Sequence, residues 1–138
     1  MNSGTKIILL AEDDENDAFF MEHALQRAQI TLPLHIVEDG EEAIQYLDGR
    51  GKFSDRSVFP FPHVVFLDLK LPYLNGFEIL EHIRRQESLI RLQVFILTSS
   101  SEERDRQRAS ELGANGYFVK PPNAAMLLEV FKDIGVME

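Results

Sequence analysis

The residues of this sequence best suited to chemistry are acids, a hydroxyl and a lysine, each of which follows a short apolar run. The acidic run at residues 12–14 follows KIILLA, Asp68 follows HVVFL, Thr98 follows QVFIL and Lys120 follows YFV. Clustered carboxylates repel one another unless a cation neutralises them, and ligands made only of oxygen suit a hard divalent ion, Mg²⁺ by preference. A lysine ammonium and a threonine hydroxyl can hold an anion. Together these groups would support Mg²⁺-dependent phosphoryl transfer to a carboxylate.

Each of these residues also has a purely structural interpretation. Asp14 can serve only as a helix cap, Asp68 can simply begin a turn, and Lys120 can be a surface residue before Pro121. Taken jointly, the positions favour a site, because polar groups that end parallel strands meet at one edge of the sheet.

The elements that must position these residues alternate between two patterns. Short β-rich runs separate longer segments with helical spacing of apolar residues. The expected strands are residues 6–11, 34–37, 63–67, 93–97 and 117–119, and the expected helices are residues 18–29, 39–47, 77–84, 102–112 and 123–134. Gly113 is placed to stop the fourth helix and Asn123 to cap the fifth. Strands that are apolar on both faces predict a parallel sheet covered on both sides.

One connection, residues 49–62, is long for a compact domain and contains Phe53, Phe59 and Phe61. It can be a tolerated surface insertion or a contact surface, and the sequence leaves both open.

The composition excludes several classes of protein. The chain has 14 basic and 23 acidic residues, a formal net charge of −9, which disfavours partners such as nucleic acid and anionic membranes. It has no cysteine, so disulfides, thiolate zinc sites and cysteine nucleophiles are excluded. No apolar run approaches the ~20 residues that span a bilayer, and we expect a cytoplasmic protein. The 138 residues predict one domain (1–138, core about 6–134) with no output domain.

Four segments resemble those of a known family: ILLAEDD (8–14), VVFLDLKLPYLNGFEIL (64–80), VFILTSS (94–100) and GANGYFVKPP (113–122). The chain resembles the receiver domain of bacterial two-component response regulators. The resemblance implies a flavodoxin-like (βα)₅ fold, a doubly wound α/β sandwich whose parallel sheet has the order 2-1-3-4-5. It also implies that Asp68 accepts a phosphoryl group from a sensor histidine kinase, so that the domain is a phospho-acceptor rather than an enzyme.

The resemblance also assigns a metal site by position. Glu12 and Asp13 match the acidic pair, with Asp13 as the direct Mg²⁺ ligand and Asp14 as its rival within the run. Lys70 matches the residue that offers its backbone carbonyl to the metal, and its side chain would overhang the site.

The remaining assignments concern the switch. Thr98 matches the hydroxyl that bonds the phosphoryl group, Tyr117 the aromatic residue that turns inward on activation, and Lys120 the lysine that pairs with the acyl phosphate. Pro121 falls where the family often has a cis peptide bond. Ser99 stands where the family usually has Ala or Gly after the threonine, which puts the rates of phosphotransfer and hydrolysis in doubt.

The partners implied are a sensor histidine kinase and an unknown downstream protein. Four features resemble regulators that are paired with phytochrome kinases: the start of the chain, the insertion at 49–62, DLKLP and LTSS. Because such regulators often dimerise, we expect a homodimer through the fourth helix, fifth strand and fifth helix. For kinase recognition we expect the exposed side of the first helix, with the candidates Asn16, Met21 and Glu22, and the adjacent loop between the fifth strand and the fifth helix. Either one of Phe19 and Phe20 faces a partner, or both pack against different neighbours within the domain.

Two other classes remain open. A Mg²⁺-dependent phosphatase would use Asp68 as a nucleophile, but it normally needs a second acid two residues later, where this chain has Lys70, and a cap domain. A receiver-like module that only binds proteins would not need the set of Asp68, Thr98 and Lys120.

Overall fold

The computed structural model describes residues 6–135, and a parallel sheet lies at its centre. Its strands are β1 (Ile8–Ala11), β2 (Leu34–Val37), β3 (Val64–Leu67), β4 (Gln93–Thr98) and β5 (Gly116–Val119). Their order across the sheet is β2-β1-β3-β4-β5. β1 and β3 are buried at every position, which is why their sequences are unbroken apolar runs. The predicted fold and strand order are therefore confirmed.

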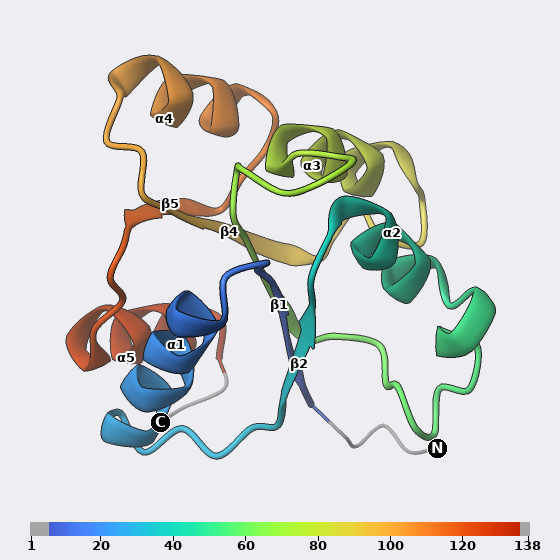
Figure 1. Cartoon of the computed structure of the whole chain (residues 1–138), viewed down its shortest axis with the longest axis horizontal. Coiled ribbons are helices and arrows are strands. Elements are labelled where there is room, and N and C mark those ends of the chain that lie inside the picture. Colours follow the sequence, from blue (N-terminus) through green and yellow to red (C-terminus); the bar gives the residue numbers. More distant parts are fainter. Residues whose placement is uncertain (1–5, 136–138) are drawn as a thin grey trace.

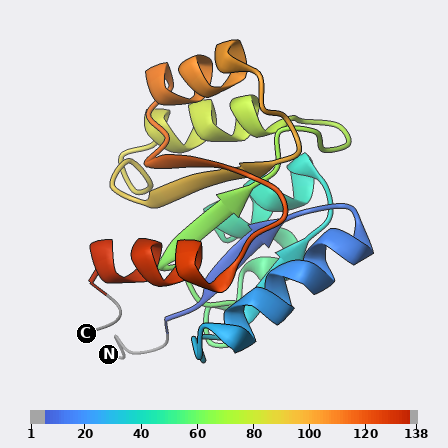
Figure 2. The same cartoon turned by 90° about the vertical axis from the view of Figure 1, so that its left-hand side faces the viewer.

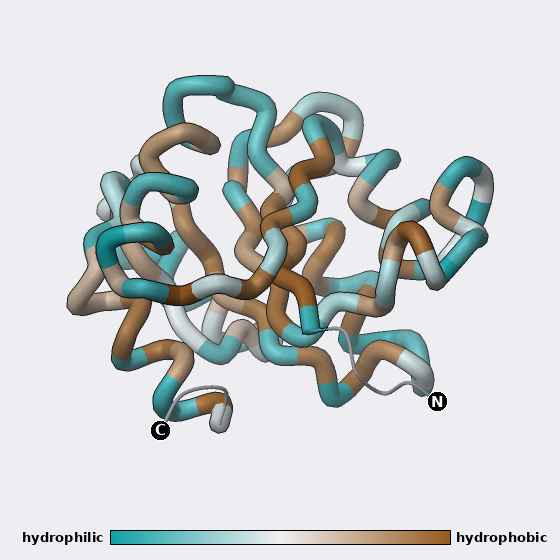
Figure 3. Tube along the Cα trace, turned by 90° about the horizontal axis from the view of Figure 1, so that it is seen from below, coloured by the Kyte–Doolittle hydropathy of each residue, from teal (hydrophilic) through white to brown (hydrophobic). Residues whose placement is uncertain are grey.

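Helices cover both faces of this sheet (Figures 1 and 2). On one face lie α1 (Glu15–Arg27) and α5 (Ala124–Asp133), and on the other α2 (Gly40–Asp48), α3 (Gly76–Arg85) and α4 (Glu103–Glu111). Successive residues of a strand point to opposite faces, so β1 contributes Ile8 and Leu10 to one core and Leu9 and Ala11 to the other. Figure 3 shows hydrophobic segments through the middle of the molecule. None of the described helices has the length and apolar character needed to cross a bilayer.

The first helix begins earlier than the spacing of apolar residues predicts. The Asp14 carboxylate accepts hydrogen bonds from the backbone N–H groups of Asn16 (2.8 Å) and Asp17 (3.1 Å). Since these are amides that the helix itself leaves unpaired, Asp14 fixes the start of α1 at Glu15. The structural interpretation of Asp14 as a cap is thus the correct one.

The sequence signals at the other helix ends behave as predicted. Asn123 caps α5 by accepting from the backbone N–H of Met126 at 2.9 Å. Gly113, with φ of +97°, follows α4 in a conformation that residues with a Cβ rarely adopt.

The connection at residues 49–62 is largely folded into the protein. It contains a 3₁₀ turn, η1 (Gly51–Phe53). Phe53 is buried and its ring centroid lies 5.0 Å from that of Phe59, which also packs against the core. Of the three aromatics, Phe61 alone stays exposed. Two of the three therefore stabilise the domain and are not available for contact.

The exposed side of α1 differs from the prediction. Met21, expected on the exposed side, is fully buried against the sheet. Phe19 and Phe20 are instead both exposed, at 59% and 48%. A helix turns 100° per residue, so three consecutive apolar residues cannot all face the core, and here Met21 is the one that does. Asn16 and Glu22 are exposed as predicted.

Candidate functional site

The carboxyl ends of four strands bring the predicted polar residues to one edge of the sheet. The last residues of β1 and β3 are paired in register, so Glu12 and Asp68, which follow them, leave neighbouring strands side by side. Thr98 ends β4 and Lys120 follows β5, which pairs with β4. Glu12, Asp68 and Thr98 are the buried polar residues of the described chain.

Lys120 is the cation at the centre of this edge. Its Nζ lies 2.6 Å from Glu12 Oε1, 2.7 Å from Asp68 Oδ2 and 2.8 Å from Asp17 Oδ2. The lysine side chain is only 10% exposed. The bond between Lys120 and Pro121 is cis, as the family resemblance implies.

Asp17 is the residue that sequence reasoning missed. An acid in the first turn of a helix is ordinarily explained by the helix dipole, and Asp17 lies in the first turn of α1. Its contact with Lys120 joins positions 103 residues apart, so no local sequence pattern predicts this contact. The available signal was the short connection between β1 and α1, which keeps the first turn of the helix near the end of β1.

The charges of this edge shift the pKa of two groups. Burial raises the pKa of Glu12 above its ordinary value of 4.5, although hydrogen bonding and attraction to Lys120 act against it, and the charge of Asp68 raises it further. Burial lowers the pKa of Lys120, but its hydrogen bonds to Asp17, Asp68 and Glu12 outweigh burial and raise the pKa overall. The ammonium group therefore stays charged.

The acids can also hold a cation. Glu12, Asp13 and Asp68 each offer a carboxylate oxygen, and these oxygens lie within 4.8 Å of one another. An all-oxygen set of this kind fits a divalent ion. The backbone N–H of Lys70 donates to Asp68 Oδ1 at 3.3 Å, which places the backbone of Lys70 beside the cluster, while its side chain is exposed.

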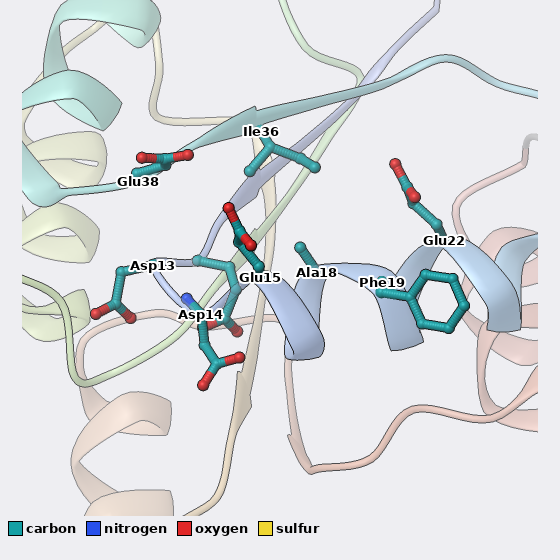
Figure 4. Close-up of a pocket in the computed structure, with 9 residues that line it drawn as sticks. Asp13, Asp14, Glu15, Ala18, Phe19, Glu22, Ile36 and Glu38 are labelled. Atoms are coloured by element: carbon teal, nitrogen blue, oxygen red, sulfur yellow. Dashed lines mark hydrogen bonds between the residues drawn. The ribbon is translucent and has the colours of Figure 1, made fainter.

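Asp13 and Asp14 both lie at the rim of an open cavity of about 250 Å³ between α1 and the edge strand β2 (Figure 4). The figure shows the carboxylates of Asp13 and Asp14 lying apart, in agreement with the role of Asp14 as a cap. Of the two rival acids, Asp13 is the one whose carboxylate joins the oxygen cluster, while that of Asp14 caps the helix.

Thr98 and Tyr117 lie next to the loop that connects β4 and α4. Thr98 is fully buried, and its hydroxyl oxygen accepts from the backbone N–H of Ser100 at 3.4 Å. Tyr117 is buried in this structure and its hydroxyl donates to the carbonyl of Ser100 at 2.9 Å. The guanidinium of Arg106 lies 4.7 Å from the centroid of the tyrosine ring. Ser99 is exposed.

Comparison with known proteins identifies the class. Residues 8–132 match the model of the response regulator receiver domain, and the chain belongs to this family. It is a receiver domain of a two-component response regulator, with the fold and the strand-end residues described above.

Several relatives are similar over nearly the whole chain. Response regulator Rcp1 of Synechocystis sp. is 33% identical over 129 residues, which cover 94% of this chain and 86% of Rcp1. The Mn²⁺-bound form of response regulator Rcp1 superposes with a TM-score of 0.76 at 34% identity, covering 94% of this chain and 88% of that one. The bacteriophytochrome response regulator RtBRR has a TM-score of 0.85 and 38% identity, covering 98% and 81%. The phosphorylated cyanobacterial phytochrome response regulator RcpA has a TM-score of 0.79 and 31% identity, covering 95% and 91%.

Proposed function

We propose that Asp68 accepts a phosphoryl group from a sensor histidine kinase, and that the modified domain changes its contacts with other proteins. The observation that carries this proposal is the environment of one carboxylate. Asp68 is 6% exposed, lies 2.7 Å from the ammonium of Lys120, and shares an oxygen cluster with Glu12 and Asp13. A buried acid held between a fixed cation and a cation-binding cluster is arranged to carry a transferred phosphoryl group.

In the reaction, a carboxylate oxygen of Asp68 attacks phosphorus, the new P–O bond forms, and the bond from phosphorus to the histidine nitrogen of the kinase breaks with its electron pair. Lys120 then donates a hydrogen bond to a phosphoryl oxygen, and the Thr98 hydroxyl donates to another. A divalent ion held by Glu12, Asp13, Asp68 and the Lys70 carbonyl would neutralise negative charge on the phosphoryl oxygens. The domain thereby assists its own phosphorylation and dephosphorylation without acting on a separate substrate.

We propose Mg²⁺ as this ion. The support is the donor set of carboxylate oxygens without histidine or cysteine, which suits Mg²⁺ and its usual shell of waters. The Mn²⁺-bound form of Rcp1 is consistent with a divalent ion in a related receiver.

The switch we propose runs from Thr98 to Tyr117. A hydroxyl that turns toward the phosphoryl group changes the packing of the loop at Ser100, to which both residues are bonded. A charge added at the site thus biases the surface formed by α4, β5 and α5. We propose this surface for a homodimer and for the downstream protein, so that the receiver domain itself makes the output contact.

We further propose that the kinase is of the phytochrome type. The support is the similarity over almost the entire chain to RtBRR and RcpA, which are phytochrome response regulators.

The test is labelling with acetyl phosphate in Mg²⁺, read by intact-mass spectrometry. The wild-type chain should gain one phosphoryl group, and Asp68→Asn should gain none. Asp133→Asn is the matched control, because Asp133 is an exposed acid on α5 and should label as the wild type does. Full labelling of Asp68→Asn would refute the assignment. Continuous release of phosphate with turnover would point to a phosphatase, and no labelling of the wild type to a module that only binds proteins.

A further inference from the structure

Asp17 is a third acid on Lys120, and it stands outside the proposed phosphoacceptor and metal cluster. Its Oδ2 accepts from Lys120 Nζ at 2.8 Å, and its own backbone N–H is bonded to Asp14. The carboxylate is 32% exposed, so water could solvate it without the lysine. The contact exists because α1, which carries Asp17, packs beside α5 and the segment that leads into it (Figures 1 and 2).

Three carboxylates surround the ammonium group of Lys120. A lysine ammonium has three N–H donors, and Lys120 has three carboxylate partners at 2.6–2.8 Å. Lys120 donates hydrogen bonds to Asp17 and Asp68, and Glu12 lies 2.6 Å from the ammonium as an ion-pair partner. The bond to Asp17 and the attraction to Glu12 together hold the ammonium in place, so that another of its donors stays directed at Asp68.

We propose that Asp17 is a positioning residue for the phosphoryl site: it holds Lys120 so that one N–H stays aimed at the group carried by Asp68. This inference rests on the proposed function of Asp68. Asp17 acts through the lysine and does not itself touch the transferred group.

Glu12 and Asp17, the two carboxylates that hold Lys120, differ in their relation to the cation-binding cluster. Glu12 belongs to the oxygen cluster suited to a divalent cation, so its charge is shared between that cation and Lys120. Asp17 is not part of this cluster, and its charge remains available to the lysine when a cation binds. When Asp68 becomes an acyl phosphate, the N–H that it accepted passes to a phosphoryl oxygen, while the bond to Asp17 can persist unchanged.

The experiment is a titration of the full chain with beryllofluoride in Mg²⁺, followed by NMR, because beryllofluoride mimics the phosphoryl group on a carboxylate. A separate Mn²⁺ titration measures cation binding alone. Asp17→Asn preserves the shape of the side chain but removes its charge, and Asp17→Glu restores the charge with a longer reach. Glu41→Gln is the control, since Glu41 is likewise an exposed acid in the first turn of a helix, α2.

We expect Asp17→Asn to weaken beryllofluoride binding about tenfold, the usual scale of one charge-assisted hydrogen bond. Its Mn²⁺ affinity should stay within about twofold of wild type, because Asp17 is not a ligand in the cluster. Asp17→Glu should recover part of the loss, and Glu41→Gln should match the wild type. A merely structural role would change Mn²⁺ binding along with beryllofluoride binding, and that result overturns the inference.

Equal beryllofluoride binding by wild type and Asp17→Asn also overturns it, while leaving the function of Asp68 intact. A wild-type chain that does not bind beryllofluoride overturns the proposed function itself, and this inference with it.

Discussion

Replacing Lys120 with methionine removes the cation from the acidic edge and should destabilise the metal-free protein. The ammonium contacts Glu12, Asp17 and Asp68, and the first and last of these are buried. Methionine fills a similar space without charge. The variant must therefore either keep unpaired carboxylates away from water or bind a proton, and both cost free energy.

The cost of keeping one carboxyl group protonated sets the expected loss of unfolding free energy in Lys120→Met. Keeping a carboxyl with the ordinary pKa of 4.5 protonated at about pH 7 costs about 3.4 kcal/mol, because each pKa unit is worth about 1.36 kcal/mol. Glu12 is the natural acceptor, since burial already raises its pKa. We therefore expect Lys120→Met to lose about 3 kcal/mol of unfolding free energy at about pH 7, within the usual range for breaking a buried ion pair.

The pH dependence has a definite sign. The folded variant holds a proton on Glu12 that the unfolded chain releases above its ordinary pKa of 4.5. Stability then falls as pH rises, by up to about 1.4 kcal/mol per pH unit for one proton, and the deficit at about pH 5 should shrink to about 1 kcal/mol. Binding of Mg²⁺ should also reduce the deficit, because it neutralises the same carboxylates.

Urea denaturation followed by circular dichroism, in chelator and in Mg²⁺, measures these differences. Lys132→Met is the matched control, because Lys132 is an exposed lysine in the last turn of α5. A Lys120→Met variant as stable as the wild type in chelator at about pH 7 would show that the ion-pair network does not stabilise the fold. A deficit that grows as pH falls would show that protonation is not its cause.

Two further perturbations test other parts of the structure. Tyr117→Ala should leave the labelling of Asp68 intact and weaken the change in dimerisation that phosphorylation causes, measured by size-exclusion chromatography. An unchanged dimerisation response would contradict the switch role of Tyr117. Arg84→Lys should cost about 1–3 kcal/mol in urea denaturation, because the guanidinium of Arg84 donates to the carbonyls of Gly113 at 2.8 Å and Leu92 at 2.9 Å, a pattern that lysine cannot reproduce. Arg85→Lys, at the exposed neighbouring position, should be nearly neutral, and equal losses in the two variants would refute this reasoning.

The fold could be predicted because its signals are local. A strand buried on both faces must be apolar throughout, and the helices between strands show their own period and their caps. The boundaries were less accurate where another rule applied. α1 begins at Glu15 because Asp14 caps it, and apolar spacing contains no information about a cap made by a polar side chain.

Orientation was harder to predict than element type. Phe19, Phe20 and Met21 are three consecutive apolar residues, and their order alone does not say which one meets the sheet. The register of α1 against the sheet buries Met21 and exposes the other two. Similarly, Phe53 and Phe59 lie in a segment without a period, so only their packing against the core shows that they are structural.

The sequence by itself determined which chemical groups stand at the ends of the strands. Glu12, Asp68, Thr98 and Lys120 each follow an apolar run, and parallel strands bring such positions to one edge. Only the tertiary structure decided how the charges are paired. Asp17 reaches Lys120 because a helix that follows the first strand packs beside the segment that follows the last, and contacts between distant segments depend on packing that no local pattern records.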